Sequence, residues 1–212
     1  CDPQHKIMVV SASKDRADNF STFTQRLIYE VPQLRHLMPS TDQRSSKIAF
    51  DVGPALADQS PSVRSIGITG QLTGSRADVI VADDIEVPNN SATQGMRDLL
   101  SERIKEFDAV LKPGGRVVYL GTPQTEQSIY KRLPDRGYVI RVWPARYPTS
   151  EKLDKYGPRL APLILGRLEK DPSLEGQSTD PDRFSEEDLT ERELSYGRSG
   201  FALQFMLDTS IS

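Results

Sequence analysis

The sequence predicts an α/β protein with a mostly parallel sheet flanked by helices, followed by a small helical subdomain. Three observations support this fold class: unbroken apolar runs of strand length at residues 6–12, 79–82 and 116–121, amphipathic helical patterns between them, and recurrent prolines with helical patterns after about residue 144. Strands buried on both faces read as continuous apolar runs, and parallel neighbours need crossover connections that are usually helices. We therefore expect one domain over residues 1–145 and a second over residues 146–212.

Each element is predicted from its local pattern. Ser13 is placed to cap a helix that carries apolar residues at helical spacing up to residue 31. Two short strands are expected at residues 46–53 and 64–70, and a long helix from about residue 96 to 111, stopped by "KPGG" at residues 112–115. A further strand is expected at residues 138–143, and helices at 159–170, 186–196 and 200–207.

Composition narrows the function classes. The 212 residues carry 27 basic and 30 acidic side chains, a net charge of −3, so a contact with duplex nucleic acid would have to be local or assembled between subunits. The single Cys1 excludes an internal disulfide, and no apolar run approaches the roughly 18 residues of a membrane span. We expect a soluble protein and, since the chain opens without methionine, a fragment of a longer one.

The stretch "DVIVADDIE" at residues 78–86 places clustered carboxylates at the end of a strand. Ligands of open parallel sheets bind at the carboxyl ends of the strands. Mg²⁺ commonly takes one or two protein carboxylates together with phosphates and waters, which offsets their mutual repulsion. The pattern predicts that Asp83 faces the Mg²⁺ of a nucleotide and that Asp84 or Glu86 polarises the attacking water. A solvated turn or a helix N-cap is the alternative.

A second polar motif follows the next apolar run. "VVYLGTP" at residues 117–123 ends in Gly121 and Thr122. A short hydroxyl side chain at this place can hydrogen-bond the γ-phosphate or a metal-bound water. Loss of the phosphate would break this bond, and the change could pass to a moving domain. The alternative is a turn that merely ends the strand.

Three segments together resemble the large terminase subunit of tailed bacteriophages, in the branch found in short-tailed lytic phages. They are "SIGITGQLTGSRADVIVADDIEVPNNSAT", "VVYLGTPQTEQSIYKRL" and "DPDRFSEEDLTERELSYGRSGFALQFML". The resemblance extends over essentially the whole chain, with several motifs in the same order.

This resemblance implies an ATPase domain of the additional-strand P-loop type, which drives double-stranded DNA into a procapsid with ATP and Mg²⁺. Asp83 would be the Walker B magnesium ligand and Asp84 would stand where many relatives carry a catalytic glutamate. Because aspartate is one methylene shorter, Glu86 is an alternative for that role. Gly121 and Thr122 would belong to the coupling motif. The implied partners are double-stranded DNA, the portal protein, the small terminase subunit and further copies in a ring, in the cytoplasm of the infected bacterial host.

Arg76 precedes the acidic strand, at a place where related packaging motors carry an arginine. Such a residue can reach the γ-phosphate held by a neighbouring subunit and stabilise transition-state charge. An ordinary surface arginine is the alternative.

The phosphate-binding pattern G-x-x-x-x-G-K-[ST] does not occur in the sequence. In the family this loop lies upstream of the matching segment and the nuclease domain lies after it. We therefore expect the isolated chain neither to hydrolyse ATP nor to cut DNA.

Three other interpretations stay open from the sequence. "FDAVLKPGGRVVYLG" at residues 107–121 is similar to S-adenosylmethionine-dependent methyltransferases, although the first strand lacks their glycine loop. A two-metal nuclease could add Asp51 as a further acid. The chain could also be a catalytically inert terminase remnant that binds partner subunits.

Overall fold

The computed structural model describes residues 2–208. The chain divides into two compact units, Cys1–Gly121 and Thr122–Ser212. This division falls earlier in the chain than the boundary after residue 145 that the sequence predicts.

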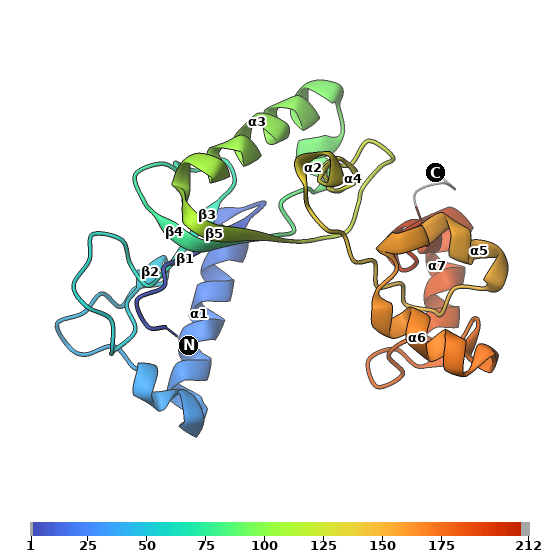
Figure 1. Cartoon of the computed structure of the whole chain (residues 1–212), viewed down its shortest axis with the longest axis horizontal. Helices are drawn as coiled ribbons and strands as arrows, with labels where there is room; N and C mark the ends of the chain where they lie inside the picture. Colours follow the sequence, from blue (N-terminus) through green and yellow to red (C-terminus); the bar gives the residue numbers. More distant parts are fainter. Residues whose placement is uncertain (1, 209–212) are drawn as a thin grey trace. The chain divides into compact units, whose positions relative to one another are not determined.

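The first unit is built around a five-stranded sheet with the spatial order β2-β3-β1-β4-β5 (Figure 1). The strands are β1 (Ile7–Ser11), β2 (Ala49–Phe50), β3 (Val63–Gly67), β4 (Ala77–Asp83) and β5 (Leu111–Leu120). β3, β1, β4 and β5 are parallel neighbours, whereas β2 pairs antiparallel with β3. The predicted α/β class with a mostly parallel sheet flanked by helices is therefore confirmed.

The two long helices of this unit cover opposite faces of the sheet (Figure 1). α1 (Lys14–Glu30) packs against β1 and β3. Its Ile28 joins Val9 and Val63 in one buried cluster. On the other face, α3 (Gln94–Val110) buries Phe107 completely, with the ring centroid 6.0 Å from that of Tyr119 in β5.

The strand register shows which side chains share the α1 face. Val9 pairs with Val81 of β4, and Val81 pairs with Val118 of β5. Side chains alternate along a strand, and paired residues of neighbouring strands point to the same face. Val81 and Val118 therefore face the same side as Val9. Val118 is 38% exposed and Leu120 49% exposed, so the β4–β5 half of this face is incompletely covered within the described residues.

β5 begins earlier than predicted. Residues 112–115 belong to the strand and do not separate it from the helix. A register shift opposite Ala77 and Val79, together with the positive φ of Gly114, accommodates them as a strand irregularity. Pro113 is tolerated because it lies in this irregularity, between the β4-paired residues Leu111 and Arg116, where its missing N–H removes no hydrogen bond of the ladder.

Two other strand predictions are wrong in whole or in part. The strand expected at residues 46–53 is reduced to the two residues of β2. The strand expected at residues 138–143 does not form, and only an isolated bridge joins Val142 to Leu160. Val139 is 74% exposed, so this apolar run does not lie in a buried sheet.

The second unit is mainly helical in the described residues. Its α-helices are α4 (Ile129–Arg132), α5 (Ser150–Tyr156), α6 (Pro162–Lys170) and α7 (Glu186–Gln204). Short 3-10 turns occupy Pro134–Arg136, Gly157–Arg159 and Pro172–Leu174. α7 is broken at Gly197, which has φ 69° and ψ 170°, close to where the sequence separates two helical patterns.

The core of this unit forms between α5, α6 and the segment that precedes them. The buried cluster consists of Tyr147, Tyr156, Leu160, Ala161, Ile164 and Leu168. In residues 2–208, no helix is both long and apolar enough to cross a membrane.

Candidate functional site

β4 carries Asp83 and Asp84 to the carboxyl edge of the parallel sheet. Ile80 and Ala82 are fully buried on the face opposite α1, and alternation turns Asp83 toward the α1 face. Asp84 follows with a positive φ of 45°, and its N–H donates to the carbonyl oxygen of Leu120 at 2.9 Å. The last residues of β4 and β5 are thus joined, and two carboxylates stand side by side at their ends.

Burial and repulsion act on the first of these carboxylates. The pKa of Asp83 is raised above its usual value, mainly because burial disfavours the charged form and further because Asp84 lies beside it. Arg16 opposes this rise. A carboxylate that is costly to ionise in the absence of a cation fits a group that binds one.

Arg16 is a site residue that the sequence analysis missed. Its Nη1 lies 3.7 Å from Oδ2 of Asp84, with the two side chains 57% and 50% exposed. The helix α1 begins directly after β1 because the Ser13 hydroxyl accepts a hydrogen bond from the N–H of Arg16. This cap fixes the first turn of α1 at the edge of the sheet where β4 ends.

Ser11 is a second residue that the sequence analysis did not single out. It pairs with Asp83 in the strand register and is 2% exposed. Its hydroxyl oxygen is buried without a hydrogen-bond partner among the described residues. The signal for both missed residues is the polar run that follows the apolar residues of β1, because parallel strands end at the same edge.

The third acid of the motif lies in a different environment. Glu86 is 1% exposed and takes part in an interaction with another residue of the chain. Asp84, in contrast, is half exposed beside Asp83. Solvent therefore reaches Asp84 much more readily than Glu86.

Gly121 lies at the same edge as the acidic pair, because the preceding Leu120 pairs with Asp83. Thr122 begins the second unit. Its carbonyl oxygen accepts a hydrogen bond from Nε2 of Gln124 at 3.0 Å.

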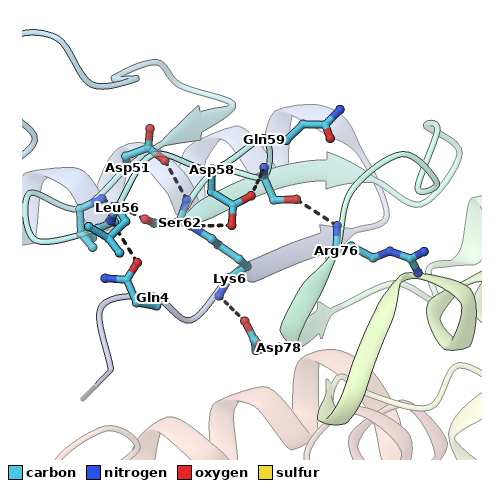
Figure 2. Close-up of polar contacts among 12 residues, drawn as sticks. Gln4, Lys6, Asp51, Leu56, Asp58, Gln59, Ser62, Arg76 and Asp78 are labelled. Carbon is cyan, nitrogen blue, oxygen red and sulfur yellow. Dashed lines mark hydrogen bonds and ion pairs between the residues drawn. The ribbon is translucent and has the colours of Figure 1, made fainter.

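Arg76 lies immediately before β4, at the amino-terminal ends of the parallel strands and therefore at the other end of β4 from Asp83 (Figure 2). Its N–H donates to Oγ of Ser60, and its Nη1 donates to the carbonyl oxygen of Ala109 at 2.8 Å. At about 3.3 Å per residue, the strand separates Arg76 from Asp83 by roughly 20 Å. The structure therefore does not bring Arg76 to the acidic pair of its own chain.

Asp51 also lies at this end of the sheet, where Figure 2 shows it beside Ser62. Its Oδ2 accepts from Nε of Arg44 at 2.9 Å and its Oδ1 accepts from the N–H of Ser62 at 3.1 Å. A nuclease site that joins Asp51 to Asp83 is therefore not formed.

The donors at the carboxyl edge suit a hard cation. Asp83 and Asp84 offer carboxylate oxygens, and the buried hydroxyl of Ser11 is an oxygen without a partner in the described part of the chain. Across residues 2–208 no group of three or more His, Cys, Asp or Glu side chains is placed to hold a metal ion. Mg²⁺ typically needs only one or two protein carboxylates because phosphates and waters complete its shell, so these residues fit it.

No protein-family model matches the chain. The chain is 57% identical over 216 aligned positions to the protein described as "Terminase, large subunit" from Enterobacteria phage T3. The chain is homologous to a terminase large subunit. The alignment covers 100% of this chain and 37% of the T3 protein, so the chain spans well under half the length of that terminase subunit.

The terminase homology confirms the resemblance inferred from the three sequence segments. The methyltransferase interpretation finds no support. It depended on a helix that ends at residues 112–115 before a strand, and the structure places these residues inside β5.

Proposed function

We propose that this chain forms part of the ATP-hydrolysing motor that packages double-stranded viral DNA into procapsids. The observation that carries the proposal is the pair Asp83 and Asp84 at the carboxyl edge of a parallel sheet, in a chain 57% identical to a terminase large subunit. The portal protein, the small terminase subunit and further copies in a ring are the partners that this function requires.

The acidic residues take distinct roles in this proposal. Asp83 would hold Mg²⁺, which would supply positive charge against the negative charge that develops during phosphoryl transfer. Asp84 orients and polarises the attacking water, because it is half exposed and adjacent to Asp83. Glu86 is buried and supports the turn that carries them. This assignment chooses between the two residues that the sequence left open for the water.

Gly121 and Thr122 are proposed to couple hydrolysis to movement. Gly121 follows β5 as the last residue of the first unit, and Thr122 is the first residue of the second unit. A change at the phosphate would thus act on the segment that leads directly into the second unit, which is the arrangement that a hinge requires.

The glycine loop that binds phosphate is proposed to come from a strand beside β5. β5 is an edge strand of the described sheet, and Val118 and Leu120 leave the α1 face exposed beside it. An additional strand and its following helix would pair with this edge and cover this face. Edge strands that present exposed apolar residues are normally paired or covered in a stable protein.

Arg76 retains only a role in trans in this proposal. It lies at the edge of the sheet opposite Asp83, so it could act only on a nucleotide held by a neighbouring copy.

The test is ATP hydrolysis by a chimera in which this chain replaces its homologous segment in the T3 protein. Asp83→Asn keeps the side-chain shape and removes the metal-binding charge. We expect a loss of about 100-fold or more in DNA-stimulated turnover, on the order seen when a key electrostatic group is removed. Asp154→Asn is the matched control, because Asp154 is exposed on α5.

Near-normal turnover of the Asp83→Asn chimera would refute the ATPase proposal. The isolated chain is expected to show no ATP turnover above its own Asp83→Ala variant, because it lacks the phosphate-binding pattern.

A further inference from the structure

We propose that residues 131–141, the basic segment, form a contact surface for the phosphate backbone of duplex DNA. The choice of DNA as the polyanion rests on the proposed packaging function. The segment reads "KRLPDRGYVIR", with four cations and one acid, a net charge of +3 in a chain whose net charge is −3. Positive charge is therefore concentrated locally, although the chain as a whole is acidic.

The first half of the basic segment is held in a defined conformation. Ser128 caps α4 by accepting from the N–H of Tyr130. Ile129 and Leu133 are 3% and 4% exposed, so they anchor this turn inward. Gly137 then takes a left-handed conformation with φ 85°, and the N–H of Tyr138 donates back to the carbonyl of Leu133. The backbone that carries these cations is preorganised, which reduces the entropic cost of binding.

The cations between these anchors point to solvent. Lys131, Arg132, Arg136 and Arg141 are all exposed. The side chains of Lys131 and Arg132 have no hydrogen-bond or ion-pair partner in residues 2–208. Other cations of the same unit are neutralised, as Arg146 is by Glu186 and Lys155 by Asp208. The charges of Lys131 and Arg132 are thus available to an external anion.

The second half of the segment has no helix or strand, and the chain is fixed just beyond its far end. The N–H of Val142 donates to the carbonyl of Arg159 at 2.7 Å, and the carbonyl of Val142 accepts from the N–H of Ala161 at 2.9 Å. The five residue-to-residue steps from Arg136 to Arg141 can span at most about 18 Å. With one base pair per 3.4 Å of helix axis, this span corresponds to about five base pairs, so the cations can contact several phosphates along one duplex.

The chemistry of this surface predicts sequence-independent binding. Lysine and arginine side chains on a short turn and the loop that follows it contact phosphates, and such contacts position a protein without reading bases. Trp143 lies two residues beyond the segment, is 55% exposed and is the single tryptophan of the chain. Tryptophan emission of this chain therefore comes from one position, next to the basic segment.

The test is the binding of a fluorescein-labelled duplex of mixed sequence to the 212-residue chain, without nucleotide, over a range of salt concentrations. Lys131→Gln/Arg132→Gln removes two charges and keeps long polar side chains. Because each phosphate contact contributes a salt slope of about −0.9, we expect the slope of log K against log salt to become shallower by about 1.8. We also expect duplex DNA to change the Trp143 emission of the wild-type chain.

Lys152→Gln/Lys170→Gln is the matched control. It makes the same change in net charge in the same unit, at exposed lysines outside the segment, and should leave the salt slope unchanged. Circular dichroism and thermal unfolding establish that each variant is folded.

Three results would overturn the proposal. The first is the absence of duplex binding by the wild-type chain at low salt. The second is an equal salt slope for the two double variants. The third is displacement of the duplex by polyglutamate at equal charge, which would indicate an acidic protein partner. The Asp83→Asn chain should bind DNA as the wild type does. Failure of the ATPase proposal and failure of the DNA surface are therefore separable.

Discussion

Replacing Arg16 by alanine is expected to raise the affinity of the Asp83–Asp84 pair for a divalent cation. The guanidinium Nη1 lies 3.7 Å from Oδ2 of Asp84, and the positive charge of Arg16 lowers the pKa of Asp83 against the effect of burial. A divalent cation bound by these carboxylates competes with the guanidinium for the same negative charge and is repelled by it. Removing Arg16 removes both effects.

The magnitude follows from the distance and the exposure. Two unit charges 3.7 Å apart interact by about 1 kcal/mol at the dielectric constant of water. Both side chains are at least half exposed, so solvent screens the pair and exposed ion pairs contribute roughly 0.2–1 kcal/mol. The upper end of this range corresponds to an increase of about fivefold in cation affinity, since 1.36 kcal/mol is a factor of ten.

The assay is Mn²⁺ binding to the 212-residue chain, followed by electron paramagnetic resonance at low ionic strength. Lys14→Gln is the matched control: it removes the same charge from the same turn of α1, but Lys14 pairs with Asp18 and not with the acidic site. Added salt should reduce the difference between the wild type and Arg16→Ala, because screening weakens exposed charges. Unchanged or lower Mn²⁺ affinity in Arg16→Ala, or an equal gain in Lys14→Gln, would refute this reasoning.

Two further predictions concern stability. Because the folded-state pKa of Asp83 is raised, its ionised form is penalised in the folded chain, and stability falls as pH rises from the unfolded-state pKa through the folded-state pKa. Asp83→Asn should therefore raise the Tm at neutral pH. The gain should disappear below about pH 3, where the carboxyl is protonated in both the folded and the unfolded state. A lower Tm of the variant at neutral pH, measured by calorimetry, would contradict this prediction. Phe107→Ala should cost about 3–5 kcal/mol in urea unfolding, because it empties a fully buried site between α3 and β5. Leu99→Ala, on the same helix but 60% exposed, should cost far less.

Local patterns were sufficient for the elements that carry the acidic pair. The apolar runs at residues 6–12 and 79–82 become β1 and β4 almost as predicted, and the helical spacing after Ser13 becomes α1. These predictions succeed because a strand buried on both faces requires a continuous apolar run in the sequence, and an amphipathic helix requires apolar residues at helical spacing. The position of Asp83 at a strand end follows directly from the same pattern.

Patterns failed where neighbours decide the conformation. Residues 112–115 contain two glycines and a proline, which in isolation favour a helix stop. In the folded chain they lie inside an edge strand, because β5 pairs with β4 on both sides of them, through Leu111 and Arg116, and the register shift accommodates them. The run at residues 138–143 has the composition of a strand, but no strand of the described sheet pairs with it, and Val139 and Trp143 lie exposed.

The sequence by itself determined the α/β class and the strand that ends in Asp83, because each follows from residues that are close together in the chain. It also determined the homology to a terminase, because that requires only the order of residues along the chain. Only the tertiary structure decided that β1 lies between β3 and β4, and this order brings Ser11 and Arg16 beside the acidic pair. Strand order and register arise from pairing between segments that are distant in the chain. The free energy of such pairing depends on complementary surfaces of both partners, which the local pattern of either segment does not contain.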